Sequence, residues 1–443
     1  MCAGSIYRSW VGNYFRCHAT RETVNTFCKI ILNRIMKMKS SNSILSIIKA
    51  ELHRVTANHS ILLTVVFAPI LYSLFLGSIY QKKEINKVPF AVVDYDHSKI
   101  TRELTRQLSA SPKIELTCSF TSDKEAADQL RQLKIQGYIV FPKGFEKEML
   151  KKNQANVDLF LNTTRFLPSN TLNMAVNKVM MDAGSRVRVQ HLESNGVNTK
   201  IAAVQANPIE PVIKPIYNVT NNYGDFLLPA LFFVILQQTL LLGLSESISK
   251  DRQEGLLIPM LQSSKRGLVS YIIAKPAYYF LLYSVYIFFF TLVIFPIFGL
   301  PVNASLLPIL VISMLFVLTV AIYSLLIGSY IKKQTHAMEI LAFSTYPLFL
   351  LSGYSWPVSA MPVVLQGISA IIPTTPMLEA MRRLYLMGGT WQSVIPQFQH
   401  LLIILGISTF LLVLRMQQLK LKTAISTTGS SQTHGRNFIA EHN

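Results

Sequence analysis

Long apolar runs occupy one stretch near the start of the chain and most of its second half. A helix needs about 20 apolar residues to cross the hydrocarbon core of a bilayer. We interpret six runs as full spans: Ile61–Tyr80, Phe226–Ser245, Tyr271–Phe298, Ala304–Ile331, Ala337–Leu351 and Gln397–Leu414. A shorter run, Val358–Ile372, contains Pro362 and Gly367 and is stopped by Pro373, which predicts a re-entrant or interfacial segment. The pattern predicts a polytopic α-helical membrane protein with about six transmembrane helices, with five or seven as alternatives.

The segment between the first two spans follows a different pattern. Short apolar, β-branched runs alternate with amphipathic stretches, and a long helical stretch bounded by Pro168 and Asn195-Gly196 follows them. This alternation predicts a small α/β domain at residues 81–225, inserted between transmembrane helices 1 and 2 and carrying a helical stalk. The predicted strands are Val88–Val93, Ile114–Cys118, Gly137–Phe141 and Val157–Leu161, and the predicted helices are Lys99–Ala110 (with Ser98 as its N-cap), Ser122–Leu133 and Phe145–Lys152.

Composition agrees with a membrane protein. Half of the 443 residues are hydrophobic and 15% are charged, against about 25% charged in a typical soluble domain. An ordinary soluble fold is therefore excluded, and so is disorder, which needs low hydrophobicity and high charge.

Basic residues give an orientation to the spans. The net charge is +19, and outside the inserted domain most Lys and Arg residues flank apolar runs. Basic flanks mark the cytoplasmic side, which predicts that both termini and the loop after the second span are cytoplasmic and that residues 81–225 are extracytoplasmic. The expected location is the cell (inner) membrane. No basic recognition element is visible, so nucleic acid is not an expected partner.

The chain divides into five expected regions. Residues 1–40 form a basic extension, which we interpret as non-native in preference to a transit peptide, because Met36-Lys37-Met38-Lys39 resembles a translation start. Residues 41–80 lead into the first span. The domain at 81–225 and a five-helix transmembrane domain at 226–420 follow, and 421–443 is a cytoplasmic tail expected to be disordered.

Candidate enzyme chemistry is sparse. The sequence has no GxxxxGK[ST], HExxH or GxSxG motif and no cysteine cluster. Asp94, Asp96 and His97 follow the first predicted strand, where a turn and a helix cap are favoured over catalysis. We therefore expect no catalytic, cofactor-binding or metal-binding residue. If the protein moves a solute uphill, the energy comes from another subunit.

The predicted cytoplasmic loop at residues 246–267 is the best candidate contact with such a subunit. Lys250, Asp251, Arg252 and Glu254 form a charged turn, Gly255 is expected to end its helix, and an apolar ridge containing Leu257 follows. A charged turn beside an apolar ridge suits docking into a groove on a soluble partner. The alternative is a short interfacial helix that binds nothing.

This loop resembles the coupling segment of ABC-2-type transporter permeases, whose pattern is Glu-Arg-Glu-x-Gly-Thr with a later Gly-Lys. The corresponding residues here are Asp251, Arg252, Gln253, Glu254, Gly255 and Leu256, with Ala274-Lys275 near the later pair. Asp, Gln and Leu depart from the pattern at its first, third and last places.

A second resemblance lies in the last third of the chain. Residues 351–362 (LSGYSWPVSAMP) resemble the family segment LSG-aromatic-x-x-P-x-x-x-MP, and the similarity continues through Pro373 and residues 378–388. Its prolines break helices, which predicts an outer re-entrant segment at 353–399. Glu379 is spaced to neutralise Arg382 and Arg383, and a gate there is a hypothesis. The segment's site residues are Gly353, Trp356, Pro357, Met361, Pro362, Pro373, Glu379 and Arg382.

The resemblance covers about residues 40–420 and carries the functional expectation. It implies the permease subunit of a multidrug-type ABC exporter that moves amphipathic drug-like or lipid-like molecules. Two permease chains, identical or related, would pair with two separate ATP-binding subunits that hold ATP and Mg, and a periplasmic adaptor and an outer-membrane channel are further partners of some relatives. The alternative is a membrane-anchored envelope sensor whose external domain binds a ligand without transport.

Overall fold

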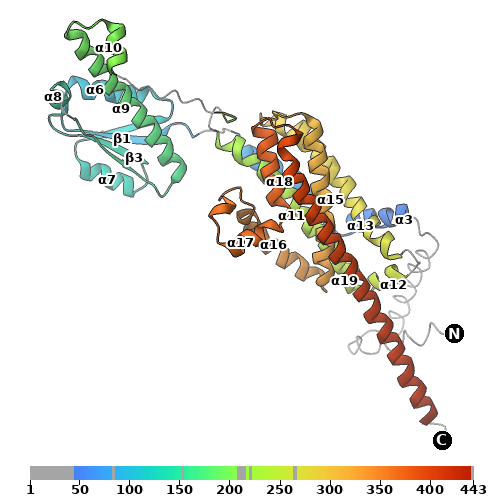
Figure 1. The fold of residues 1–443 in the computed structure, drawn as a ribbon. Helices are drawn as coiled ribbons and strands as arrows, with labels where there is room; N and C mark the ends of the chain where they lie inside the picture. Colours follow the sequence, from blue (N-terminus) through green and yellow to red (C-terminus); the bar gives the residue numbers. More distant parts are fainter. Residues whose placement is uncertain are drawn as a thin grey trace. The chain divides into compact units, whose positions relative to one another are not determined.

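The computed structural model describes residues 44–81, 85–151, 154–206, 216–218, 222–262 and 267–440, so the predicted extension at 1–40 lies outside the described residues. The chain forms two compact units (Figure 1). Residues 82–215 make up one unit, and the segments before and after them make up the other.

The larger unit is helical throughout its described part, as expected for a chain whose apolar runs must satisfy their own backbone hydrogen bonds in lipid. Its elements are α3 (Ile44–Ala57), α4 (His59–Leu62), η1 (Leu63–Phe67), α5 (Ala68–Ile79), α11 (Tyr223–Gln253), α12 (Leu257–Gln262), α13 (Gly267–Phe289), η2 (Phe290–Ile294), α14 (Phe295–Ile297), α15 (Leu306–Tyr330), α16 (Gln334–Leu351), η3 (Val358–Ala360), α17 (Val363–Ala370), α18 (Thr374–Met381), η4 (Arg382–Leu386) and α19 (Trp391–Ala440).

Five described helical stretches are long and apolar enough to cross a membrane: His59–Ile79, Tyr223–Gln253, Gly267–Ile297, Leu306–Tyr330 and Trp391–Leu421. The count is six if α17 and Thr374–Leu386, which meet at a bend of 83°, form one broken span. The unit is therefore a polytopic membrane protein. The predicted span at Ala337–Leu351 is a helix, α16, but it is not among the five stretches. Polar residues occupy its first turns and lower the mean hydropathy of the whole helix. Helix α19 continues to Ala440, through the tail for which the sequence predicts disorder.

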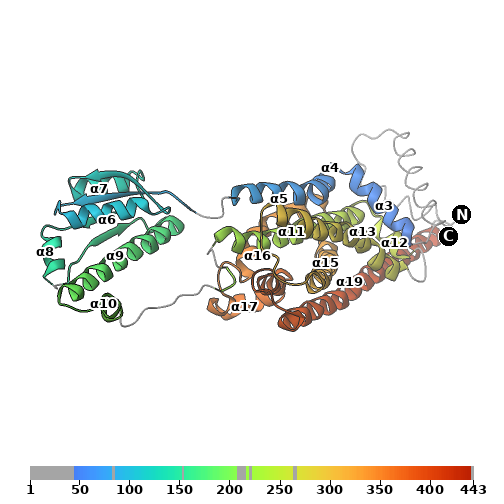
Figure 2. The same cartoon turned by 90° about the horizontal axis from the view of Figure 1, so that it is seen from above.

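Helix α11 lies inside the bundle, with α5, α13, α15 and α16 around it (Figure 2). In its most apolar window 83% of the residues are buried, against 28% for His59–Ile79 and 22% for Trp391–Leu421. The outer helices thus present apolar side chains to lipid, whereas α11 packs against protein on nearly every side.

The smaller unit contains a four-stranded sheet in the order β2-β1-β3-β4. The strands are β1 (Val88–Asp94), β2 (Ile114–Phe120), β3 (Gly137–Phe141) and β4 (Asp158–Leu161), and each begins and ends within two residues of the predicted bounds. Strand β1 pairs in parallel with β2 and β3, and β4 joins antiparallel to β3.

Helices cover both faces of this sheet, which explains why β1 and β3 are continuous apolar runs rather than alternating ones. Phe90 and Val92 pack under α6 (Lys99–Ala110) and α9 (Phe166–Ser194), and Ala91 and Val93 pack on the other face under α7 (Asp123–Arg131). The remaining described helices are α8 (Phe145–Leu150) and α10 (Thr199–Ala206).

Candidate functional site

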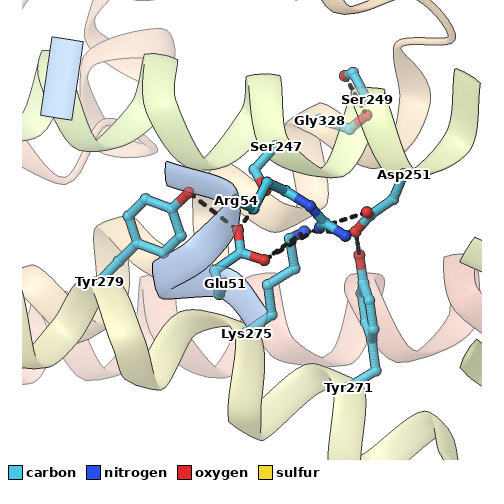
Figure 3. Close-up of polar contacts among 9 residues, drawn as sticks. All are labelled: Glu51, Arg54, Ser247, Ser249, Asp251, Tyr271, Lys275, Tyr279 and Gly328. Atoms are coloured by element: carbon cyan, nitrogen blue, oxygen red, sulfur yellow. Dashed lines mark hydrogen bonds and ion pairs between the residues drawn. The ribbon is translucent and has the colours of Figure 1, made fainter. Parts of the chain in front are cut away.

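Four charged side chains from three different helices meet inside the helical unit (Figure 3). We call this group the buried ion cluster; its members are Glu51 and Arg54 from α3, Asp251 from α11 and Lys275 from α13. Lys275 Nζ lies 2.5 Å from Asp251 Oδ2 and 3.4 Å from Glu51 Oε2. Arg54 Nη1 lies 2.5 Å from Asp251 Oδ1 and 3.1 Å from Glu51 Oε2. Each cation therefore contacts both carboxylates.

The cluster is electrically balanced and almost free of solvent. The Asp251, Lys275 and Glu51 side chains are 0%, 1% and 3% exposed. Two carboxylates and two cations sum to zero, which is the condition under which buried charges are tolerated. Burial opposes the charged form of Arg54, but the charges of Asp251 and Glu51 outweigh it and raise the pKa of its guanidinium above the ordinary value.

Hydroxyl groups complete the hydrogen bonding of the carboxylates. Tyr271 donates to Asp251 Oδ2 at 2.9 Å, Tyr279 donates to Glu51 Oε1 at 3.2 Å, and Ser247 also donates to Glu51 Oε1. These hydroxyls supply donors to Asp251 Oδ2 and Glu51 Oε1, whereas Asp251 Oδ1 is held by its ion pair with Arg54.

Helical spacing explains why these side chains converge. On α13, Tyr271 and Tyr279 lie four residues on either side of Lys275 and so share its face. On α11, Ser247 and Asp251 are also four residues apart. Each helix thus contributes one polar stripe to an otherwise apolar contact.

The same stretch of α11 approaches α15 very closely. An added Cβ at Gly328 would lie 2.7 Å from the Ser245 Cα atom. Ser245 donates a hydrogen bond to the Ser324 carbonyl oxygen at 2.8 Å, and Ser249 donates to the Gly328 carbonyl oxygen at 3.3 Å (Figure 3). The end of α11 that carries Asp251 is therefore fixed to α3, α13 and α15.

The structure divides the predicted coupling residues into buried and exposed ones. Asp251 belongs to the buried ion cluster, and Arg252 donates to the Ser329 carbonyl oxygen at 2.7 Å. Lys250 is half-buried, and Glu254 and Gly255 are exposed. Gly255 follows the end of α11 with φ +68°, as predicted for a residue that ends a helix.

The predicted apolar ridge does not form an exposed patch. Leu256, Leu257 and Leu261 are 7%, 1% and 0% exposed, and the last two belong to the main hydrophobic core. Helix α12 folds back and buries these leucines against the bundle, so the docking role of Leu257 stays a prediction. Among the described residues just before α12, the turn from Gln253 to Gly255 is exposed.

Helix α16 begins beside this turn. The Gln334 backbone N–H donates to Gln253 Oε1 at 3.0 Å, and Gln334 Nε2 donates to Glu246 Oε1 at 2.6 Å. Lys332 and Lys333, in the connection to α16, are exposed. We call residues 253–255 with Lys332 and Lys333 the exposed turn surface.

The second predicted group lies at the other end of the helices. Glu379 pairs with Arg382 at 3.2 Å and with Arg383 at 3.0 Å, which is the neutralisation expected from their spacing. Gly353 has φ +80° and begins the break after α16. Trp356, Pro357 and Pro362 are exposed, Met361 is half-buried and Pro373 is buried.

A cavity of about 400 Å³ opens beside these residues. Its wall includes Gly353, Tyr354 and Pro357 from the break, Glu379 and Arg382 from α18 and its extension, and Gln397 and His400 from α19. Gly353, Pro357, Glu379 and Arg382 of the predicted segment therefore line a space, whereas Trp356, Met361, Pro362 and Pro373 do not. Of the predicted coupling residues, Asp251 belongs to the ion cluster at the opposite end.

The acidic residues at the end of β1 and just after it hold the turn that leads into α6. Asp94 Oδ1 accepts from the backbone N–H groups of Asp96 and His97 at 2.9 and 3.0 Å. Asp96 accepts from the N–H groups of Gly144 and Glu146 at 2.7 and 3.0 Å. Within the described residues, no group of three His, Cys, Asp or Glu side chains could hold a metal ion.

Sequence reasoning missed Glu51 and the role of Lys275. The available signal was the lysine itself, a charge near the start of a long apolar run that requires an internal partner. Nothing local in the sequence identifies Glu51 as that partner, because the two residues are 224 positions apart.

Comparisons with known proteins agree with the resemblance. The family model described as ABC-2 family transporter protein matches residues 59–415. The probable multidrug ABC transporter permease YbhS of Escherichia coli (strain K12) is 24% identical over 344 residues, which cover 76% of this chain and 87% of the relative. The probable multidrug ABC transporter permease YbhR of the same organism is also 24% identical over 344 residues, covering 75% of this chain and 88% of the relative.

Proposed function

This chain belongs to the ABC-2 transporter family and is a membrane-integral permease, and from that premise we propose that it is the transmembrane subunit of an ATP-driven exporter. Its cargo in this proposal is an amphipathic drug-like or lipid-like molecule. The multidrug permeases among its relatives support that class of cargo.

An ATP-binding subunit is the partner that the family implies. We propose two permease chains, identical or related, with two such subunits, which bind ATP and Mg and perform the hydrolysis. In this arrangement the permease itself catalyses no reaction. We extend the proposal to a periplasmic adaptor and an outer-membrane channel, which would contact the α/β unit.

The orientation follows the basic flanks of the spans. Both termini and the exposed turn surface would be cytoplasmic, with the α/β unit outside the cell membrane and about six spans in total. Lys332 and Lys333 belong to the exposed turn surface and support its cytoplasmic assignment.

One observation carries the proposed mechanism: Asp251 in the buried ion cluster is only three residues from the exposed Glu254. A displacement of the exposed turn surface would therefore be transmitted to α3, α13 and α15 through the short, rigid end of α11. ATP-driven closure of the partner would move these helices together and open the central path alternately to each side.

The test is to purify the protein from native membranes in mild detergent and to identify bound proteins by mass spectrometry. We expect a stoichiometric ATP-binding subunit that is lost from the R252A/E254A variant. E339A is the matched control, because Glu339 is an exposed glutamate on the neighbouring α16 and its side chain is 71% exposed. The D251N/K275M variant, which keeps the cluster electrically neutral, should keep the partner but lose the coupling of ATP hydrolysis to export.

The sensor alternative makes the opposite prediction. A clean preparation without an ATP-binding subunit, repeated after crosslinking, would support an anchored interaction protein. Full export by variants in which Asp251, Arg252, Glu254 and Leu257 are each replaced by Ala would refute the coupling assignment.

A further inference from the structure

The cavity beside Glu379 and Arg382 lies at the end of the helix bundle opposite the buried ion cluster. Tyr354, in its wall, donates a hydrogen bond to the Phe226 carbonyl oxygen in the first turn of α11, and the two rings stack at 4.7 Å. Asp251 lies near the last turn of the same helix, about 38 Å away at 1.5 Å per residue. This separation exceeds the roughly 30 Å hydrocarbon thickness, so the cavity reaches the level of the lipid head groups.

A second contact supports this placement. The Asn303 N–H donates to the Tyr385 carbonyl oxygen at 3.2 Å, and Asn303 Nδ2 donates to the Leu386 carbonyl oxygen at 2.9 Å. The short connection between the third and fourth crossing helices therefore packs on the chain that follows Arg382. Polar connections of this kind lie at the membrane surface.

The charges at the cavity favour an anion. Glu379 is shared by Arg382 and Arg383, so the trio has a net charge of +1. The Arg382 guanidinium also lies over the Tyr354 ring, 5.1 Å from its centroid, which fixes the arginine in the wall.

Two polar atoms of the wall lack a partner among the described residues. Arg382 Nε is a donor, Gln397 Oε1 is an acceptor, and both atoms are buried. Buried polar atoms without a hydrogen bond in native structures point to a water or ligand that satisfies them. Both residues line the cavity, so a molecule that fills it can offer an acceptor to Arg382 and a donor to Gln397 when these side chains turn toward it.

An exposed apolar helix adjoins the cavity. Val363, Val364 and Ile368 of α17 are 82%, 74% and 40% exposed. The end of α17 is tied to the wall, because Thr375 donates to the Ser369 carbonyl oxygen at 2.8 Å and His400 Nε2 lies 2.7 Å from the Ala370 carbonyl oxygen. A ligand in the cavity can therefore extend an apolar part along α17.

We propose that this cavity binds the head group of an anionic phospholipid of the phosphatidylglycerol class. The phosphate accepts from the Arg382 guanidinium, whose side chain is 35% exposed, a head-group hydroxyl donates to the Gln397 side-chain carbonyl oxygen, and the acyl chains lie against α17. The site lies far from the exposed turn surface, so the proposal stands apart from ATP coupling.

The test uses the purified full chain and native mass spectrometry during titration with phosphatidylglycerol. Phosphatidylcholine with the same acyl chains is the head-group control, and glycerol 3-phosphate is the chain-free probe. We expect R382Q to weaken phosphatidylglycerol binding about tenfold, in line with the loss of a charged hydrogen bond. Q397L should weaken it without changing the charge, which separates recognition from simple attraction.

Arg415 supplies a matched control. Its guanidinium lies 4.4 Å from the Tyr330 ring centroid and its Nε is also buried without a described partner, but it does not line the cavity. R415Q should therefore leave the affinity unchanged.

An equal loss in R415Q and R382Q would overturn the proposal, as would equal binding of both lipids. Tight binding of glycerol 3-phosphate alone would assign the cavity to a soluble phosphate and also overturn it. Melting temperatures of the variants identify any loss that is due to unfolding.

Discussion

Lys275 and Asp251 face each other across the contact between α13 and α11, with Nζ and Oδ2 2.5 Å apart and both side chains essentially removed from solvent. Each residue also has a second partner, because Arg54 pairs with Asp251 and Glu51 pairs with Lys275. The contact therefore joins three helices, and its energetics depend on all four charges together.

Removing one charge of the cluster should destabilise the helical unit strongly. D251N leaves two cations with one carboxylate, and K275M leaves two carboxylates with one cation. We expect each single variant to lose about 3–5 kcal/mol of unfolding free energy, because an uncompensated charge stays buried. Denaturant unfolding of the purified protein provides the measurement.

The double variant D251N/K275M restores neutrality and tests this explanation. It should lose clearly less than the sum of the single losses, with a coupling of about 0.5–3 kcal/mol. Strict additivity would mean that the two residues do not interact energetically.

Gly328 should not tolerate a methyl group. Its added Cβ would lie 2.7 Å from the Ser245 Cα atom, and backbone atoms cannot move aside as a flexible side chain can. G328A should therefore separate α15 from α11 and lower the melting temperature by several degrees, which we would follow by a thermal unfolding assay in detergent.

Gly406 of α19 is the matched control for that change. No atom lies within 4 Å of its added Cβ, so G406A should be neutral or slightly stabilising, since alanine favours helices more than glycine does. Similar losses in both variants would refute the role of close packing at Gly328.

The hydroxyl and the ring of Tyr354 should make separate contributions to the free energy of unfolding. Y354F removes the hydrogen bond to the Phe226 carbonyl oxygen but keeps the stacked ring, and should lose about 1 kcal/mol of unfolding free energy. Y354A also removes the buried ring and should lose about 3–5 kcal/mol. Y346F, at an exposed tyrosine of α16, should change nothing measurable. A loss in Y346F equal to that in Y354F would contradict the assignment.

At acidic pH, protonation of Asp96 should lower the stability of the α/β unit around this residue. Slight burial of this carboxyl opposes ionisation, but hydrogen bonds from the Glu146 N–H, the Ser98 hydroxyl and the Gly144 N–H outweigh it and lower its pKa. A group with a depressed folded pKa stabilises the fold above its unfolded pKa, and that contribution disappears as the pH falls through the folded pKa. Hydrogen exchange of the segment around Gly144 should therefore accelerate at acidic pH.

D96N provides the comparison for this pH effect. The variant lacks the titrating carboxylate, so exchange near Gly144 should be faster at neutral pH and should change less on acidification. If D96N and the unchanged protein show the same acid response, another group is responsible.

The sequence predicts those helices and strands that are determined by residues close together in the chain. Apolar runs predict the crossing helices because lipid demands them, and β-branched runs such as Val88–Val93 predict the buried strands of the α/β unit. Ser98 is found as the N-cap of α6, because a serine before an amphipathic helix satisfies an open backbone N–H group.

Properties that depend on distant partners were not predictable. The second span was expected to end at Ser245 and a separate helical turn to end at Gly255, but α11 runs without a break to Gln253, because its polar residues find partners in α3, α13 and α15. Asp251 and Leu257 were expected on a docking surface, but both are buried, since their surroundings come from elements far away in the sequence. Gly255, whose role depends on its own backbone angle, was identified correctly.

The buried ion cluster also has a consequence for the order in which the helices assemble during synthesis. Glu51 and Arg54 leave the ribosome with α3, but Asp251 and Lys275 are some 200 residues downstream. At about 5–20 residues per second, that delay lasts on the order of 10–40 seconds. During this interval Glu51 and Arg54 can pair only with each other, three residues apart on α3. Helix α3 can therefore complete its contacts only after α13 has been made, before the later helices α15, α16, α18 and α19 join the bundle.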